Sequence, residues 1–212
     1  MTSDGTHTAV AGTSSRLTYV GDQSEFHGDS ADVGADAIRA LLHGEGLNPI
    51  TTKLTVCDTT IVDGFDLEAA ELPIAVKFTH CVFRDRINLE QAKAAALYFV
   101  DCRLHGIAAD QLQTTFGFVV EKCVDTGGIS LKGAHIGGQI SFNGTKLRRP
   151  GGWAMVADGL TVEQDMRCSD NFEAQGAVRL VGAHIGGQFL SGNSRFLNPG
   201  GDAVEASGMV VE

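Results

Sequence analysis

Three of the five cysteines recur at one spacing, because Cys81, Cys102 and Cys123 are each 21 residues apart. The motif Leu54-x-x-Cys57 extends this series toward the N-terminus at a wider spacing. Thiols in such a file could bind a metal or form disulfides. Zinc, however, needs four ligands in a tetrahedron, and stacked residues hold their Cα–Cβ bonds in parallel, which disfavours a disulfide. We therefore predict a structural column of small buried side chains.

Two histidines, His135 and His184, stand in identical surroundings and could bind a metal or donate a proton. If they lie two coils apart at the usual strand spacing, they are about 10 Å from each other. That separation is too large for them to share one ion. The prediction is a surface histidine copied by duplication.

No enzyme motif accompanies these residues. The sequence lacks G-x-G-x-x-G, G-x-x-x-x-G-K-[ST], H-E-x-x-H and G-x-S-x-G, and GAHIGG has the wrong spacing for a dinucleotide site. Its Gly-Gly pair is expected at a corner, where glycine would supply positive φ. We predict no catalytic, cofactor-binding or metal-binding residues, no cofactor and no enzymatic activity.

The element that must position these side chains is a repeat. GAHIGGQ occurs at residues 133–139 and again at 182–188, a shift of 49 residues, and Pro150-Gly151-Gly152 recurs as Pro199-Gly200-Gly201. A fixed period indicates supersecondary units that bury their apolar faces only by stacking on each other.

A shorter unit lies inside the repeat. Apolar residues come in doublets, such as Ile129/Leu131 and Ile140/Phe142, with a step of five or six residues. Neither the helical pattern nor continuous strand alternation fits. Four doublets would make one coil of about 20 to 22 residues, and the coils that hold the 49-residue repeat would have 24 or 25. The predicted core of the repeat comprises Leu131, Ile136, Phe142, Leu180 and Ile185.

The segments Ala134-His135-Ile136-Gly137-Gly138 and Ala183-His184-Ile185-Gly186-Gly187 resemble the unit of the pentapeptide-repeat superfamily. The resemblance covers roughly Leu54 to the C-terminus. It implies an all-β, right-handed quadrilateral β-helix. The phrases VRLVGAHIGGQ and CRLHGIAADQL are also similar to actinobacterial repeat proteins that carry the label "membrane-associated oxidoreductase".

The predicted organisation has three parts. Residues 1–30 form a flexible arm with one candidate strand at 17–20, and residues 31–49 form a capping helix that Ser30 or Asp32 could start. Its apolar face, Ile38, Leu41 and Leu42, is expected to cover the first coil. Residues 50–212 form a solenoid of about seven coils, with a protruding corner at 148–152, a polar loop at 165–175 and an open or partner-covered C-terminal end.

Composition limits the function classes. The net charge is −10, and no basic footprint for phosphate backbones is evident, so direct nucleic-acid binding is not expected. No stretch approaches the roughly 20 apolar residues of a transmembrane helix, and the start lacks an export signal. An odd number of cysteines without a CxxC agrees with a reducing compartment. The predicted location is cytoplasmic.

The sequence thus predicts a non-catalytic scaffold that binds an unidentified protein partner, or self-associates, through flat solenoid faces. A homodimer through the C-terminal coil is one form of this prediction. The resemblance to acidic pentapeptide-repeat proteins of the quinolone-resistance type implies an alternative, a DNA mimic acting on DNA gyrase. The oxidoreductase label supplies a further alternative.

Overall fold

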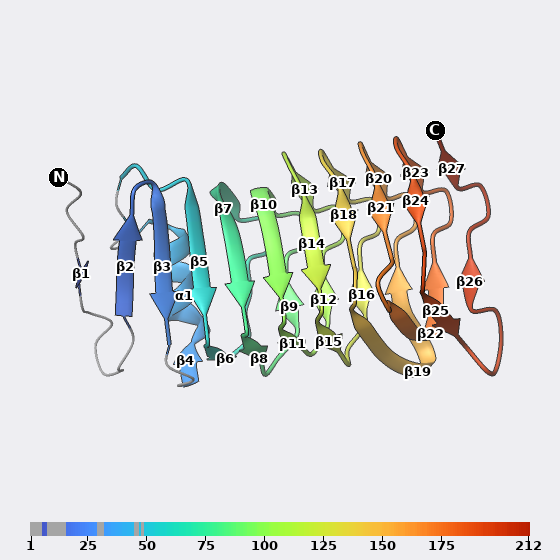
Figure 1. The fold of residues 1–212 in the computed structure, drawn as a ribbon, viewed down its shortest axis with the longest axis horizontal. Coiled ribbons are helices and arrows are strands. Elements are labelled where there is room, and N and C mark those ends of the chain that lie inside the picture. The colour runs from blue at the N-terminus through green and yellow to red at the C-terminus, as the bar shows by residue number, and fades with distance from the viewer. Residues whose placement is uncertain (1–5, 8–15, 29–31, 45–46, 48) are drawn as a thin grey trace.

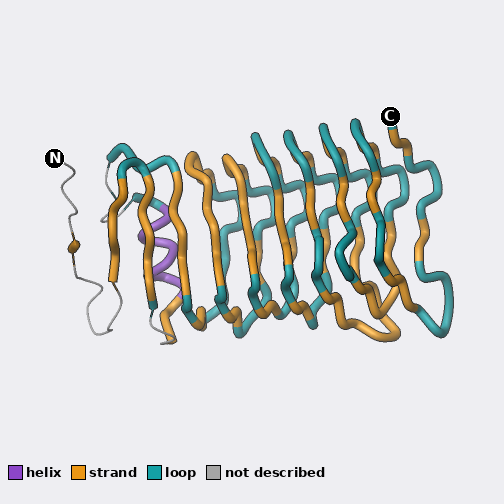
Figure 2. The backbone as a smooth tube through the Cα atoms, in the orientation of Figure 1, coloured by secondary structure: helices purple, strands orange, loops and turns teal. Residues whose placement is uncertain are grey.

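In the computed structural model, which describes residues 6–7, 16–28, 32–44, 47 and 49–212, the chain winds into an all-β solenoid of about seven turns. The coils follow one another along the long axis, from the N-terminal end at the left of Figure 1 to the C-terminal end at the right. Figure 2 shows the strand segments of successive coils side by side, with loops at the corners. The predicted β-helix with a short N-terminal helix is therefore confirmed.

The strands of the solenoid lie on four faces, and successive coils pair in parallel within each face. The strands of the first face are β3 (Gln23–His27), β5 (Lys53–Cys57), β14 (Phe118–Glu121), β18 (Ile140–Ser141), β21 (Met166–Arg167) and β24 (Phe189–Leu190). Those of the second face are β4 (Asp32–Gly34), β6 (Thr60–Val62), β8 (Val82–Phe83), β11 (Arg103–Leu104), β15 (Val124–Asp125) and β25 (Arg195–Leu197).

The third and fourth faces complete each coil. The strands of the third face are β9 (Ile87–Asn88), β12 (Ile107–Ala108), β16 (Ile129–Ser130) and β26 (Val204–Glu205). Those of the fourth are β13 (Gln113–Thr114), β17 (His135–Ile136), β20 (Thr161–Val162), β23 (His184–Ile185) and β27 (Val210–Val211). Four longer strands span two neighbouring faces: β7 (Glu71–Thr79) and β10 (Lys93–Val100) join the fourth to the first, whereas β19 (Lys146–Val156) and β22 (Glu173–Arg179) join the second to the third.

The strand register gives the coil lengths. The first coil, from Ser24 to its partner Leu54, has 30 residues because it contains the helix. The next four, up to Ile140, have 21 or 22 residues. Ile140 then pairs with Met166, and Met166 with Phe189, which gives coils of 26 and 23 residues. The 49-residue repeat is therefore one long and one short coil, where the sequence predicts two nearly equal ones.

The core is a continuous column of inward side chains. Its centre is a stack of phenylalanines in which the ring of Phe99 lies 5.3 Å from that of Phe78, 5.8 Å from that of Phe83 and 6.3 Å from that of Phe118. The five residues predicted as the repeat core are all buried. They lie on three faces: Phe142 follows the first-face strand β18, Leu131 and Leu180 follow third-face strands, and Ile136 and Ile185 belong to the fourth face.

Glycine has two separate uses at the corners. Gly133 and Gly182, which begin the two GAHIGGQ segments, have φ of 62° and 64°, and Ala69 takes the equivalent left-handed conformation in an earlier coil. The Gly-Gly pair does not supply positive φ, so that expectation is wrong. A Cβ on Gly137 would instead lie 2.5 Å from the carbonyl oxygen of Thr115 in the preceding coil. This pair is required because two backbones approach closely.

The solenoid begins earlier than the sequence predicts. Strand β3, within the predicted arm, pairs in parallel with β5, so it is the first rung. Strand β2 (Arg16–Val20) agrees with the candidate strand at 17–20 and pairs antiparallel with β3 and with β1 (Thr6–His7). The inward positions of β3 are Ser24 and Phe26. Because Ser24 is polar, β3 lacks the apolar doublet by which the sequence reveals the other rungs.

The single helix among the described residues is α1 (Ala35–Leu42). It lies within the first coil, between β4 and β5, and Arg39 donates to the Asp66 carbonyl of the next coil at 3.3 Å. Ile38, Leu41 and Leu42 are buried in the core. The residue that caps the helix is Gly34, without a side-chain hydrogen bond, so Asp32 does not have the capping role that the sequence suggests, and Ser30 lies outside the described residues. Among the described residues, no helix has the length and apolar character needed to span a bilayer.

Candidate functional site

Three cysteine side chains form a file at the corner between the first and second faces. Strand register aligns Cys81 with Cys102 and Cys102 with Cys123, and it continues the file with Thr59 at one end and Thr145 at the other. The three thiols and the Thr145 hydroxyl each donate to a strand carbonyl of the preceding coil, whereas the Thr59 hydroxyl donates to Cys57 O in its own coil. The Cys123 thiol donates to Phe99 O at 3.4 Å, and the Thr145 hydroxyl donates to Val120 O at 2.6 Å. The file therefore links each coil to backbone carbonyls of the coil before it.

Burial governs the chemistry of this file. The hydrogen bond to Cys102 and then burial raise the pKa of Cys81 and of Cys123. Hydrogen bonds from Cys123 and Cys81 lower the pKa of the central Cys102 thiol, while burial opposes them. All three side chains are at most 1% exposed, so a soluble reagent cannot reach any of the sulfurs. The fifth cysteine, Cys168, is buried in the core with a pKa raised to about 12 by burial.

Cys57 is not part of the file, which corrects the sequence-based alignment. It pairs with His27 and Thr79, and Thr59 holds the position next to Cys81. Its thiol lies 3.2 Å from the Oε1 atom of Glu25 on the outer side of the first face. Burial, followed by this hydrogen bond to Glu25, raises the pKa of Cys57 to about 12.

The two repeated histidines form matching ion pairs. His135 Nε2 lies 3.3 Å from Glu163 Oε1, and His184 Nε2 lies 3.2 Å from Glu212 Oε1. Both pairs join adjacent coils of the fourth face, and the two histidines are two coils apart in the ladder β17–β20–β23. Duplication has thus copied a contact between coils, including its carboxylate.

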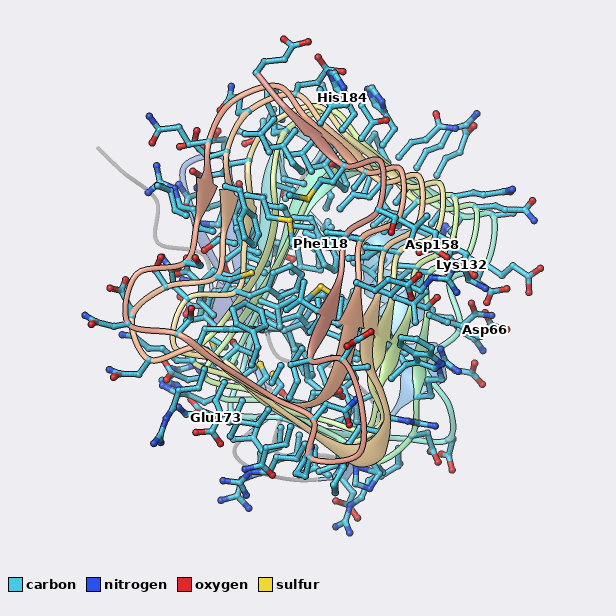
Figure 3. The ribbon with its side chains drawn as sticks, turned by 90° about the vertical axis from the view of Figure 1, so that its right-hand side faces the viewer. Asp66, Phe118, Lys132, Asp158, Glu173 and His184 are labelled. Carbon is cyan, nitrogen blue, oxygen red and sulfur yellow. The ribbon has the colours of Figure 1, made fainter. Side chains whose placement is uncertain are left out.

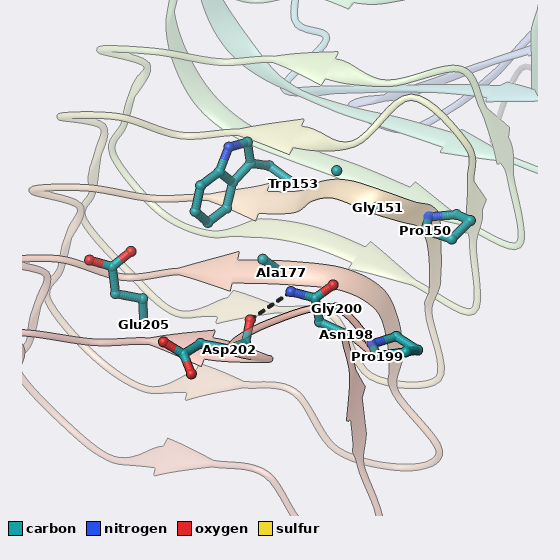
Figure 4. A pocket seen from close by; sticks show the side chains of 10 residues that line it. Pro150, Gly151, Trp153, Ala177, Asn198, Pro199, Gly200, Asp202 and Glu205 are labelled. Atoms are coloured by element: carbon teal, nitrogen blue, oxygen red, sulfur yellow. Dashed lines mark hydrogen bonds between the residues drawn. The ribbon is translucent and has the colours of Figure 1, made fainter.

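The second-to-third-face corner carries a groove of about 670 Å³. It arises because two coils have long corners around Pro150 and Pro199, while the coil between them turns through Gly176 and Ala177. Figure 4 shows the two corners on either side of Ala177. The residues that line the groove are Pro150, Gly151, Gly152, Trp153, Ala177, Asn198, Pro199, Gly200, Asp202 and Glu205.

Trp153 is the principal side chain of this corner groove. It is the single tryptophan of the chain and is 46% exposed. The Arg179 guanidinium lies 5.8 Å from the centre of its ring and pairs with Glu205 at 3.5 Å. Asp202 is exposed and has no ion pair among the described residues. The groove therefore combines an aromatic platform with acidic charge.

Sequence reasoning predicts the corner at 148–152 but not the groove, because a groove needs two long corners separated by a short one. The predicted polar loop at 165–175 is also wrong in part, since β21 and the start of β22 lie within it. A partial signal was present in the repetition of Pro-Gly-Gly at a spacing of two coils.

Charges on the third face form a mixed file. The register places Glu68, Glu90, Asp110, Lys132 and Asp158 in successive coils. Figure 3 shows Asp66, Lys132 and Asp158 on the same side of the solenoid. Burial favours a raised pKa for Asp110, but hydrogen bonds from Lys132 and Ser130 outweigh it and lower the pKa. Lys132 Nζ lies 2.8 Å from Asp110 Oδ2. A positive charge thus interrupts the row of acidic residues.

Comparison of the chain with models of protein families, with curated proteins and with solved structures finds no match in any of the three.

Proposed function

We propose that this β-solenoid is a scaffold that holds an extended segment of a partner protein in the corner groove. The observation that carries the proposal is the exposed Trp153, which follows the first Pro-Gly-Gly corner and faces a groove bounded by the second. Exposed tryptophans surrounded by a concave surface are typical of binding hot spots. The proposal places the contact at a corner and not on the flat faces that the sequence suggests.

The charges of the groove indicate the chemistry of the partner segment. Its two charged lining residues, Asp202 and Glu205, are acidic. A segment with a Lys or Arg beside an apolar or aromatic residue would pair with Asp202 and pack on the indole. The volume of about 670 Å³ lies within the usual range of about 300–1,000 Å³ for ligand sites. Parallel pairing of β19 with β22, and of β22 with β25 and β26, connects the two corners beneath the groove.

Peptide selection tests this proposal. Phage-displayed peptides selected on the full chain should be enriched in Lys or Arg, and the selected peptides should change the fluorescence of Trp153. Trp153→Ala should weaken their binding at least about tenfold, which corresponds to about 1.4 kcal/mol. Phe116→Ala removes another exposed aromatic side chain outside the groove and should leave binding unchanged. Peptides that bind wild type and Trp153→Ala equally would exclude the groove.

A DNA mimic acting on gyrase remains the second candidate, and the acidic residues of the third face favour it. Such a mimic needs uninterrupted negative charge along the rod, and Lys132 breaks the row. A supercoiling assay decides the matter: inhibition by the protein that Glu68→Lys together with Glu90→Lys relieves would support mimicry. Unchanged gyrase activity at micromolar protein would exclude it.

Other expectations stay predictions. Membership of the pentapeptide-repeat superfamily is supported by the five-residue steps of the coil from Leu97, through Cys102 and Ile107, to Leu112, all of which are buried.

Self-association is supported by apolar side chains exposed on the last rungs, Leu197, Val204, Val210 and Val211, and sedimentation would test it. A cytoplasmic location and an oxidoreductase activity are among these predictions. An absorption spectrum of the purified protein would reveal a chromophoric cofactor.

A further inference from the structure

We propose that Glu25, His27 and Cys57 form a zinc site on the outer side of the first two coils. Their ligand atoms, one from each residue, all lie within 4.8 Å of one another. Glu25 Oε1 lies 3.2 Å from Cys57 Sγ and 3.3 Å from His27 Nε2. Two ligands of a tetrahedral zinc ion, with bonds of about 2.0–2.3 Å, stand at comparable separations from each other.

The backbone brings these three residues together. Glu25 and His27 alternate with the buried Phe26 on β3, so both point outward. Cys57 pairs in register with His27 on the neighbouring strand β5, and Gly28 N donates to Cys57 O at 3.2 Å. Cys57 is also the one cysteine that does not belong to the hydrophobic core cluster. Its thiol is therefore oriented toward the Glu25 and His27 side chains.

A second group of side chains supports the imidazole. His27 Nδ1 lies 3.9 Å from Asp58 Oδ2, on the side of the ring away from Glu25, and His80 Nδ1 lies 3.6 Å from Asp58 Oδ1. Metal-bound histidines commonly direct their second nitrogen at a carboxylate, which fixes the ring and its tautomer. Asp58 is thus placed as a positioning residue, and it links His27 to His80.

The donor set favours zinc over the hard cations. A thiolate and an imidazole suit Zn²⁺, whereas Mg²⁺ and Ca²⁺ prefer oxygen ligands alone. Binding would release the thiol proton of Cys57 to solvent as the sulfur–zinc bond forms. Three protein ligands leave a fourth position for water.

The position of the site indicates its effect. A metal at Glu25, His27 and Cys57 would connect β3 to β5, the two rungs that enclose the 30-residue first coil and its helix. Since a ligand that binds only the folded state stabilises it, zinc should raise the thermal unfolding temperature of the N-terminal coils.

Cobalt titration tests the proposal with the full chain, first dialysed against a chelator. Co²⁺ should bind one equivalent and produce a thiolate-to-metal charge-transfer band that Zn²⁺ then removes. Cys57→Ser should abolish the band, and His27→Gln should weaken Co²⁺ binding at least about tenfold. His135→Ala is the matched control, because it removes a histidine with a similar carboxylate contact but without a thiol.

Asp58→Asn tests the positioning role separately. It should retain the charge-transfer band, since Cys57 still binds, but lower the Co²⁺ affinity about 10- to 100-fold. Far-UV circular dichroism of each variant verifies that the solenoid is intact. Wild-type protein without a thiolate band, or a folded Cys57→Ser variant with wild-type Co²⁺ affinity, would overturn the assignment.

Discussion

Phe99→Ala should lower the free energy of unfolding by about 3–5 kcal/mol, the usual cost of removing a large buried aromatic side chain. Phe99 is fully buried, and its ring packs against those of Phe78 and Phe83 in the preceding coil and of Phe118 in the following coil. A cavity at this point interrupts the central stack. Because each coil of a solenoid is stabilised mainly by its neighbours, the loss should affect the coils on both sides.

Urea unfolding measured by circular dichroism provides the check. The neighbouring residue Tyr98 points outward and is half-buried, so Tyr98→Ala is the matched control and should cost less than about 1 kcal/mol. Equal midpoints for the two variants would show that the phenylalanine stack does not stabilise the fold.

Leu42→Asp has the second large expected effect. Leu42 is 3% exposed on the buried side of α1, so the substitution places a carboxylate without a partner among Ile38, Leu41 and the core. The cost of an unpaired buried charge should detach the helix from the first coil. Open rungs with unpaired backbone groups and apolar side chains then become available for association between molecules.

The expected result is aggregation, measured as a loss of soluble protein and as a rise in light scattering. Leu42→Met keeps the volume and the apolar character, and it should remain soluble with a change below about 1.5 kcal/mol. Full solubility of the Leu42→Asp variant, with the helix still formed, would contradict the proposed covering role of α1.

The N-terminal region shows where local pattern stops being informative. Sequence reasoning assigns residues 1–30 to an arm, yet β3 pairs with β5 as a rung, and the inward hydroxyl of Ser24 forms a hydrogen bond with that of Thr51 at 2.8 Å. Spacing alone aligns Cys57 with the other cysteines. The register pairs Cys57 with His27 and Thr79 and sets Thr59 beside Cys81, so the Cys57 thiol lies outside the file, next to Glu25.

The backbone conformation of the corners is also difficult to predict from the sequence. Asp58, His80 and Gln91 adopt positive φ without being glycine, which the sequence does not indicate. Gly137, by contrast, is required by a neighbouring coil and not by its own dihedral angles. The corner groove depends on the alternation of long and short corners, which becomes visible only when the coils are in register.

The amino-acid sequence by itself determined the solenoid, the 49-residue repeat and the inward doublets, because burial every five residues is a local property of the chain. Only the tertiary structure decided which outward side chains meet. Residues about 20 to 30 positions apart become neighbours through the register of adjacent coils, and one added or missing residue at a corner exchanges the inner and outer faces. The cluster of Glu25, His27 and Cys57 and the corner groove both depend on that register.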